Sequence, residues 1–285
     1  ANVVIPVWGK SHANSTVQVS LGKEKINTTA DASGNWSVQF EKRKATASPT
    51  VMRIESEGQQ IQFKDIVVGE VWVCAGQSNM EWALQQSARG HEELSRGNAP
   101  QLRLMHLRGG TRGTLGAYDQ TQWTRLTPET YCKGKWKVAT TASASEFSAV
   151  GWYFGRFLQQ ELQVPVGLIC PAVGGTPTEA WIPAETLLNN VDLKGLVSGD
   201  WLDNERLGAF CRSRGRQNLL AAIQAGESIP GDACGPNHPF KPGFMWQAGI
   251  KPLIPFAIRG VIWYQGESNA ETTARTQEHG KLFPL

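Results

Sequence analysis

Three stretches of the sequence place polar or small residues directly after apolar runs, where they could support acyl transfer. They span residues 75–82, 171–177 and 264–270. A serine hydroxyl just beyond a buried strand lies at the rim of a sheet, where the N–H groups that start a helix can stabilise an oxyanion. Ser78 in the first stretch is therefore a candidate nucleophile. The alternative is that Ser78 only caps a helix that begins near Asn79.

The second and third stretches offer groups that such a nucleophile would need around it. Gly174 and Gly175 allow the backbone to approach a ligand and to turn an N–H toward it, although a plain turn explains them equally well. Gln265 and Asn269 carry side-chain amide donors, and Glu267 is a carboxylate among few other charges. The alternative for this segment is that it caps the next helix. The three stretches together indicate a site more strongly than any one alone.

Apolar strands alternating with helices would position these stretches. Four apolar runs are predicted to be strands: 66–75, 101–107, 164–170 and 258–264. Apolar spacing predicts helices in three segments: 147–162, 184–188 and 218–225. Alternating strands and helices favour right-handed crossovers and a mostly parallel sheet with helices on both faces. Ligands of such sheets bind beyond the carboxyl ends of the strands, which is where the three stretches begin.

The first 66 residues have a different pattern. Short segments alternate between polar and apolar residues and are separated by turn residues: 16–20, 36–40, 51–54 and 61–63. Short strands at this spacing predict a small antiparallel β-sandwich, which we expect to lack its first strand because the sequence opens within an apolar run. We therefore expect two units. Residues 1–66 form the β-sandwich, and residues 67–285 form a three-layer α/β unit around a central parallel sheet.

The same stretches resemble a known family. Residues 69–82, GEVWVCAGQSNMEW, closely resemble the nucleophile block of the sialate O-acetylesterases, which belong to the SGNH hydrolases, GDSL-like esterases with a flavodoxin-like fold. Further blocks match in the same order: 147–155, 164–169, 174–181 and 260–270. The β-rich start also resembles the β-sandwich that precedes the esterase domain in many members. The resemblance thus implies an SGNH esterase domain over 67–285, incomplete at its C-terminus, behind that sandwich.

Carried over by position, the resemblance implies that Ser78 is the catalytic nucleophile. The N–H groups of Ser78 and Gly175 and one side-chain amide would form the oxyanion hole, with Gln265 preferred to Asn269 as the amide. Three further residues would line the site: Gln77, Asn79 and Glu267. The implied reaction removes O-acetyl groups from carbohydrate through an acetyl-serine, and O-acetylated sialic acid is the expected substrate. The resemblance implies no metal and no cofactor.

The general base is the part of the site that this sequence does not supply. The family takes it from an Asp-x-x-His block, in which the Asp orients the imidazole. None of the five histidines has an Asp three residues before it: His12, His91, His106, His238 and His279. We expect the chain to be a fragment that lacks this block. Alternatively, a second chain supplies the base, or the protein has lost catalysis.

The composition of the chain argues against several classes of binding partner. The formal net charge of +3 and the short basic runs argue against a nucleic-acid partner, and no apolar run reaches the ~18 residues of a membrane span. The five cysteines lack metal-ligand spacing, although Cys211 and Cys234 flank a polar, glycine-rich stretch and could pair. The 11 tryptophans either pack in the core or form a surface for sugar rings.

An acetylated sugar or glycan is therefore the expected partner, and a secreted or periplasmic location is expected although the sequence as given shows no signal peptide. Two rival functions remain. One is an esterase of acetylated plant polysaccharide such as xylan, because the motifs mark the chemistry more than the glycan. The other is a non-catalytic carbohydrate-binding protein in which the serine site is vestigial.

Overall fold

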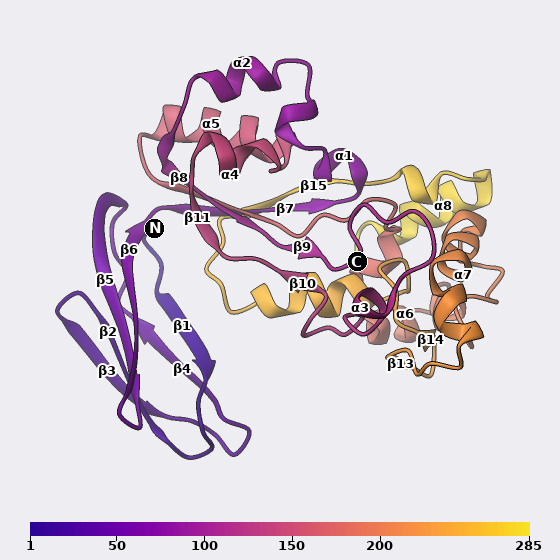
Figure 1. Ribbon diagram of the computed structural model, residues 1–285, viewed down its shortest axis with the longest axis horizontal. Helices are drawn as coiled ribbons and strands as arrows, with labels where there is room; N and C mark the ends of the chain where they lie inside the picture. The colour runs from indigo at the N-terminus through magenta and orange to yellow at the C-terminus, as the bar shows by residue number, and fades with distance from the viewer.

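A mixed five-stranded sheet runs through the larger part of the molecule, which a computed structural model describes over residues 1–285 (Figure 1). Its strands, in spatial order, are β11 (Trp136–Ala139), β8 (Ala99–His106), β12 (Val166–Cys170), β7 (Glu70–Gly76) and β15 (Gly260–Tyr264). The last four are parallel, and β11 pairs antiparallel with β8. The strands expected within 101–107, 164–170 and 258–264 are present, whereas the run 66–75 is divided at Gly69 between β7 and a strand of another sheet, β6 (Gln59–Val68). The fold class is α/β, and the edge strand β11 makes the sheet mixed.

Helices and turns cover the two faces of this sheet. Those on one side in Figure 1 include α1 (Ser78–Glu81), η1 (Leu84–Gln86), α2 (Gly90–Ser95), α4 (Thr141–Ser145) and α5 (Ala149–Leu162). The remaining helices are α3 (Gln120–Trp123), η2 (Thr178–Trp181), α6 (Ala184–Asn189), η3 (Lys194–Val197), α7 (Ala209–Gln224), η4 (Trp246–Ile250), η5 (Lys251–Leu253), η6 (Glu267–Asn269) and α8 (Thr273–Leu282). Two short two-stranded antiparallel sheets complete the α/β unit: β9 (Arg108–Gly109) with β10 (Cys132–Lys133), and β13 (Gly231–Asp232) with β14 (Gly235–Pro236).

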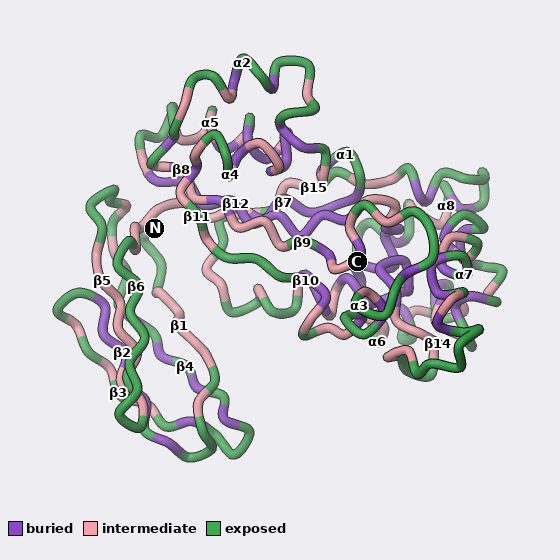
Figure 2. The backbone as a smooth tube through the Cα atoms, viewed as in Figure 1, coloured by how far each residue is buried: buried purple, intermediate pink, exposed green.

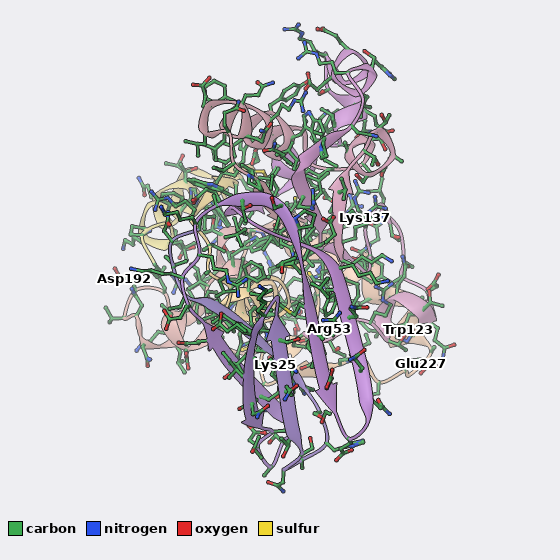
Figure 3. The ribbon with its side chains drawn as sticks, turned by 90° about the vertical axis from the view of Figure 1, so that its left-hand side faces the viewer. Lys25, Arg53, Trp123, Lys137, Asp192 and Glu227 are labelled. Carbon is green, nitrogen blue, oxygen red and sulfur yellow. The ribbon has the colours of Figure 1, made fainter.

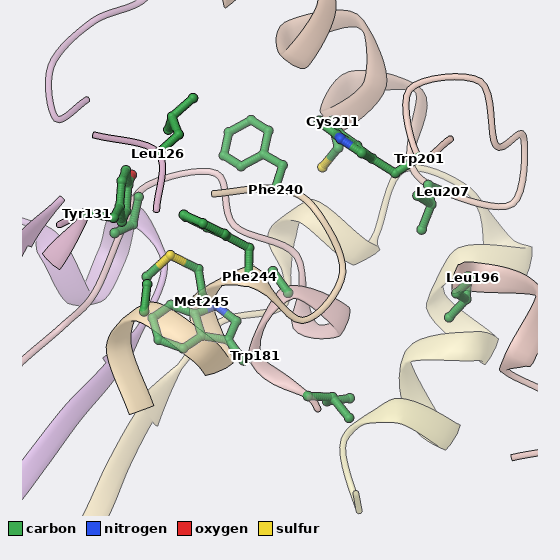
Figure 4. Packing of buried hydrophobic residues seen from close by; sticks show 14 of the residues in the cluster. Leu126, Tyr131, Trp181, Leu196, Trp201, Leu207, Cys211, Phe240, Phe244 and Met245 are labelled. Atoms are coloured by element: carbon green, nitrogen blue, oxygen red, sulfur yellow. The ribbon is translucent and has the colours of Figure 1, made fainter. Parts of the chain in front are cut away.

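Successive residues of β7 enter two different hydrophobic clusters, because side chains alternate across a strand. Val73 and Ala75 belong to a cluster of 25 buried residues, and Cys74 belongs to a cluster of 15 on the other face. Figure 2 shows this burial along the central strands, and Figure 4 shows part of the larger cluster, where Phe240, Phe244 and Met245 are drawn. Burial on both faces explains the nearly unbroken apolar run in the sequence of this strand.

Helix α5 confirms the helix expected over 147–162, and most of its apolar stripe packs against the cluster of 15 residues. It begins where Ser148 Oγ accepts a hydrogen bond of 2.9 Å from Gly151 N. Its buried residues include Trp152 and Gly155, whereas Phe157 is 64% exposed. A Cβ on Gly155 would lie 2.6 Å from the Leu168 side chain. Small residues therefore let this helix approach β12 closely.

The N-terminal 68 residues contain two antiparallel sheets, and the first helix of the chain begins at Ser78. One sheet pairs β1 (Ile5–Lys10) with β4 (Asn35–Phe40). The other has the order β3 (Glu24–Thr29), β2 (Thr16–Leu21), β5 (Thr46–Ser56) and β6 (Gln59–Val68). Buried residues from both sheets, Val17 and Phe40 among them, form one cluster. Charged side chains such as Lys25 and Arg53 project from these strands in Figure 3.

A single residue, Gly69, separates β6 from β7. Its backbone is closely packed, since a Cβ there would lie 1.9 Å from the carbonyl oxygen of Pro165. Two further contacts join the N-terminal sheets to the rest of the chain. Arg103 pairs with Asp65 at 3.0 Å, and the rings of Trp8 and Phe256 meet edge to face at 5.8 Å. The division at residue 66 stays a prediction, and β6 continues two residues beyond it.

All five cysteines are free, so the suggested pairing of Cys211 with Cys234 is wrong. Cys211 is buried in α7, and its sulfur lies 4.0 Å from the Gly175 carbonyl oxygen. Cys234 instead directs its sulfur to the Val197 carbonyl oxygen at 3.3 Å. The two thiols thus lie in different local environments. Separately, no helix has the length and apolar character needed to cross a membrane.

Acidification is expected to destabilise the protein because His238 is buried as a neutral imidazole. Its Nδ1 accepts a hydrogen bond of 3.1 Å from Phe240 N, and its Nε2 lies 3.1 Å from Asn218 Oδ1. Burial lowers the pKa of His238 to about 3, whereas an unfolded histidine has a pKa of about 6.5. The unfolded state therefore binds more protons between these values. His238 alone should lower the free energy of unfolding by about 1.4 kcal/mol per pH unit as the pH drops from ~6 toward 3.

Urea unfolding at pH 7 and pH 4.5 measures this dependence. The His238→Gln variant should lose about half of the difference that the two buried histidines cause between these pH values, while His91→Gln, at an exposed position, should keep it. His106 contributes in the same direction, because burial, followed by Arg108 and Arg112, lowers its pKa to about 4. An unchanged pH slope in His238→Gln would show that the imidazole is not the group responsible.

Candidate active site

The carboxyl ends of β7, β12 and β15 are joined by backbone hydrogen bonds, so the three polar stretches lie at one edge of the sheet. Gln77 N donates to the Tyr264 carbonyl oxygen at 3.0 Å, and Val173 N donates to the Gly76 carbonyl oxygen at 3.2 Å. Gly76 has φ +139°, and a Cβ on it would lie 2.1 Å from the Tyr264 oxygen. Only glycine fits where the first stretch leaves the sheet. The convergence expected from the parallel strand order is therefore present in the backbone.

Ser78 is the first residue of α1 and its side chain is exposed. Gln77 occupies the cap position and makes no side-chain capping hydrogen bond, so the alternative that Ser78 is the helix cap is wrong. The backbone N–H of Ser78 makes no hydrogen bond within the chain, as expected at the first turn of a helix. The second stretch lies beside it, since a Cβ on Gly174 would be 3.6 Å from Ser78 Cβ.

The two glycines of the second stretch differ in what their N–H groups do. Gly174 N donates to Glu81 Oε2 at 2.6 Å, so this donor is occupied. Gly175 N makes no hydrogen bond within the chain, while the Gly175 carbonyl oxygen accepts one of 2.9 Å from Ser268 Oγ. Ser78 and Gly175 therefore both keep a free backbone donor in this region, as the suggested oxyanion hole requires. Their role in such a site stays a prediction.

The Gln265 side chain ties the third stretch to the first two. Its Nε2 lies 3.1 Å from Gln77 Oε1, 3.3 Å from the Thr176 carbonyl oxygen and 2.7 Å from Asn269 Oδ1. All three are acceptors inside the protein. An amide has only two N–H bonds, so in this arrangement Gln265 has no donor left for an external oxyanion. Its assignment to the oxyanion hole stays a prediction.

Asn269 is fully buried and is likewise engaged by its surroundings. Its Oδ1 accepts a hydrogen bond of 2.8 Å from Thr178 N, and its Nδ2 donates to Glu179 Oε2 at 2.8 Å. Glu179 is 1% exposed and pairs with Arg275 of α8 at 2.5 Å. This buried ion pair joins η2, which follows the second stretch, to α8, which follows the third. Neither Glu179 nor Arg275 was expected from the sequence, because nothing in the local pattern links residues that lie 96 positions apart.

The remaining expected residues divide between the interior and the rim of the site. Gln77 is buried, and its Oε1 also accepts a hydrogen bond of 3.2 Å from Ser268 N. Asn79 and Glu267 are exposed and hydrogen-bond to each other through their side chains. Gln77 thus supports the backbone of the third stretch. Asn79 and Glu267 are the two that remain accessible from solvent.

A cleft of ≈ 660 Å³ opens beside Ser78. Its lining includes Trp82, which is 50% exposed, and Glu81, and it includes four basic residues, Arg108, Arg112, Arg125 and Lys133. The volume is in the usual range for small-molecule sites. Glu81 and Trp82 lie in the first stretch, but no site role was expected for them. The basic residues come from the irregular region between β8 and β11, where no periodic pattern predicts their convergence.

No histidine hydrogen-bonds to Ser78, and none lines the cleft. His12 lies among the N-terminal strands and pairs with Glu57. His106 packs edge to face on Phe147 with ring centroids 5.8 Å apart. The origin of the general base therefore stays a prediction. No group of three or more His, Cys, Asp or Glu side chains is arranged to hold a metal ion.

Gly175→Ala is expected to destabilise the protein by about 2 kcal/mol, because φ +79° disfavours any Cβ and the new Cβ would lie 2.6 Å from the Phe240 ring. Gly199→Ala is the matched control. Its φ of +68° is similar, but a Cβ there meets nothing within 4 Å. Urea unfolding should therefore show a smaller loss for Gly199→Ala. Equal losses of unfolding free energy would mean that the Phe240 ring moves away from the new Cβ without destabilising the protein.

Comparison with known proteins finds related sequences that carry a name, although no family model matches. The chain is 31% identical to the human protein named sialate O-acetylesterase over 277 residues, which cover 92% of this chain and 45% of that protein. The mouse protein of the same name is 29% identical over 280 residues, with 93% and 49% covered. The chain thus spans about half the length of the curated relatives that it matches.

A solved structure agrees with these relatives. The chain resembles the crystal structure of a carbohydrate acetylesterase from Xanthomonas citri, with a TM-score of 0.70 and 30% sequence identity. The match covers 98% of this chain and 51% of that chain. Both the N-terminal sheets and the α/β unit therefore lie within the matched part.

Proposed function

Because the chain belongs, over the length that it shares with them, to the family of the sialate O-acetylesterases, we propose that it is a serine esterase that removes O-acetyl groups from carbohydrate. The observation that supports this best is the exposed Ser78 hydroxyl at the mouth of a cleft, beside the free N–H groups of Ser78 and Gly175. O-acetylated sialic acid is the proposed substrate. A glycan substrate favours a secreted or periplasmic location.

The proposed reaction is acyl transfer in two steps. A base removes the proton of Ser78 as its oxygen attacks the acetyl carbonyl, and the tetrahedral oxyanion rests against the N–H groups of Ser78 and Gly175. Each such donor is worth about 3 kcal/mol at the barrier. The intermediate then collapses and breaks the bond to the sugar oxygen, which takes the proton from the base and leaves as a hydroxyl group. Water attacks the acetyl-serine in the same way and releases acetate and free Ser78. We rank these backbone donors above Gln265 and Asn269, whose amide hydrogens have acceptors inside the protein.

The proposal assigns the base to a histidine in an Asp-x-x-His block, which these 285 residues do not contain. It also assigns the α/β unit to the flavodoxin-like SGNH hydrolases and the two N-terminal sheets to a β-sandwich, divided near residue 66. Trp82 would pack its ring against the sugar, since an exposed indole at the cleft offers a large apolar face.

Acetate release from two substrates tests this proposal. A longer polypeptide that contains this chain and the Asp-x-x-His block should release acetate from O-acetylated sialic acid faster than from acetylated xylan. Faster release of acetate from acetylated xylan would support the esterase activity but show that sialic acid is the wrong substrate. Binding of sialic acid without any acetate release, even when a base is present, would favour a carbohydrate-binding protein with a vestigial serine.

A further inference from the structure

The charges around the cleft beside Ser78 are strongly unbalanced. Four basic side chains line it, whereas Glu81 is the single carboxylate among the lining residues. The formal charge of the lining is therefore +3, equal to that of the whole chain, although the lining comprises only 10 residues. The reaction proposed above does not use these cations. Their concentration beside the nucleophile calls for a separate explanation.

Two of the four cations are already engaged by carboxylates. Arg112 Nε lies 2.8 Å from Glu81 Oε1, and Arg112 Nη1 lies 3.1 Å from Glu146 Oε2. Arg108 approaches the same Glu146 oxygen at 3.8 Å. Glu81 in turn accepts the N–H of Gly174. Arg112 thus connects the cleft wall to the loop beside Ser78.

The other two cations have no carboxylate partner. The Arg125 side chain makes no hydrogen bond or ion pair within the chain, and it rests against the loop at Gly110, where a Cβ would lie 3.4 Å from its Cζ. Lys133 Nζ donates to the Glu129 carbonyl oxygen at 2.6 Å and forms no ion pair. Both residues are exposed. They present two uncompensated positive charges to any molecule in the cleft.

We propose that Arg125 and Lys133 bind an anionic group of the sugar and so determine its specificity, favouring acidic over neutral acetylated sugars. The inference rests on the proposed function only in placing the sugar in this cleft. A guanidinium can hold a carboxylate through two parallel hydrogen bonds, and the ammonium adds a point charge. Both residues come from the region between β8 and β11, which is separate from the three strand ends. Specificity and acyl transfer are therefore carried by different parts of the chain.

Binding to the 285-residue chain with the Ser78→Ala substitution tests this directly, because it requires neither hydrolysis nor the general base. NMR titration would compare N-acetylneuraminic acid with its methyl ester, which has no charge. The acid should bind at least about fivefold more tightly at low ionic strength, and raising the salt to ~0.5 M should remove most of this difference. Equal affinity for acid and ester would overturn the proposal.

Substitutions then show which residues cause the preference for the acid over its ester. Arg125→Gln and Lys133→Gln should each reduce the preference for the acid while leaving binding of the ester unchanged, which also shows that the variants are folded. The matched controls are Arg89→Gln and Lys135→Gln, exposed cations outside the cleft, and they should keep the preference. Loss of preference in the controls but not in the cleft variants would contradict the assignment.

A sugar phosphate distinguishes the source of the anion. If galactose 6-phosphate binds more tightly than N-acetylneuraminic acid, and does so through Arg125 and Lys133, the same subsite serves a phosphorylated sugar. The outcome is independent of the proposed esterase activity. A protein that prefers the acid but never releases acetate would refute the proposed esterase function and support the anion subsite. An active esterase that does not prefer the acid would support the function and refute the subsite.

Discussion

Replacing Ser78 by Ala is expected to lower kcat/KM for an acetylated sugar by about 10⁴-fold or more in any polypeptide that combines this chain with the general base. The hydroxyl is the only proposed group that forms the bond to the acetyl carbon. In the 285-residue chain, wild type and Ser78→Ala should differ little, since no imidazole hydrogen-bonds to the serine. Acetate release, or hydrolysis of p-nitrophenyl acetate, measures both cases.

Two controls make this comparison sharp. Ser95→Ala removes another exposed serine hydroxyl, one that donates to the Glu92 carbonyl oxygen at 2.7 Å, and it should leave the rate unchanged. Added imidazole should supply the missing base in part, raising the rate of the 285-residue chain above that of Ser78→Ala at the same imidazole concentration. A large loss on Ser78→Ala without imidazole would mean that a histidine of this chain is the base.

Arg275→Met is expected to destabilise the fold by about 3–5 kcal/mol, because it leaves the Glu179 carboxylate buried without its cation. Glu179 is 1% exposed and Arg275 7%, and their side chains meet at 2.5 Å. The same arginine also pairs with Glu278. Urea unfolding measures the loss. The loop that carries Asn269 should also become less protected against hydrogen exchange, since Glu179 holds the Asn269 amide.

The matched control lies on the same helix. Lys281 pairs with Asp192 at 2.8 Å, but both side chains are more than half exposed, so Lys281→Met should cost less than about 1 kcal/mol. Glu179→Gln in the Arg275→Met background should recover much of the loss, because the buried charge is gone and the amide oxygen still accepts from Asn269. If Arg275→Met costs no more than Lys281→Met, the buried pair does not stabilise the fold.

The convergence of the three polar stretches was predictable because it follows from strand order alone. β7, β12 and β15 are parallel neighbours, so their carboxyl ends must meet, and the Gln77–Tyr264 hydrogen bond is a direct result. The two-sided burial of β7 was equally visible in its unbroken apolar run. Strand β11 was not, because four residues that include Lys137 give too short an alternation to stand out.

Other features depend on tertiary packing that no local pattern records. Apolar spacing in α5 correctly selected Phe154, which packs against the core, but it also selected Phe157, which is 64% exposed. It gave no sign of the close approach to β12 at Gly155. The amides of Gln265 and Asn269 were identifiable as donors, but the acceptors that engage them come from distant segments. The cations of the cleft converge only because the chain between β8 and β11 lines the cleft beside Ser78.

The one-residue connection at Gly69 restricts movement of the N-terminal sheets relative to β7, the strand that precedes the nucleophile. Flexible linkers of many residues let the parts that they join tumble separately, but β6 passes into β7 within one residue. The Asp65–Arg103 and Trp8–Phe256 contacts resist bending at the same point. In solution the whole chain should therefore reorient with a single rotational correlation time. A long glycan that contacts both parts would therefore bind to two surfaces held at a fixed distance from each other.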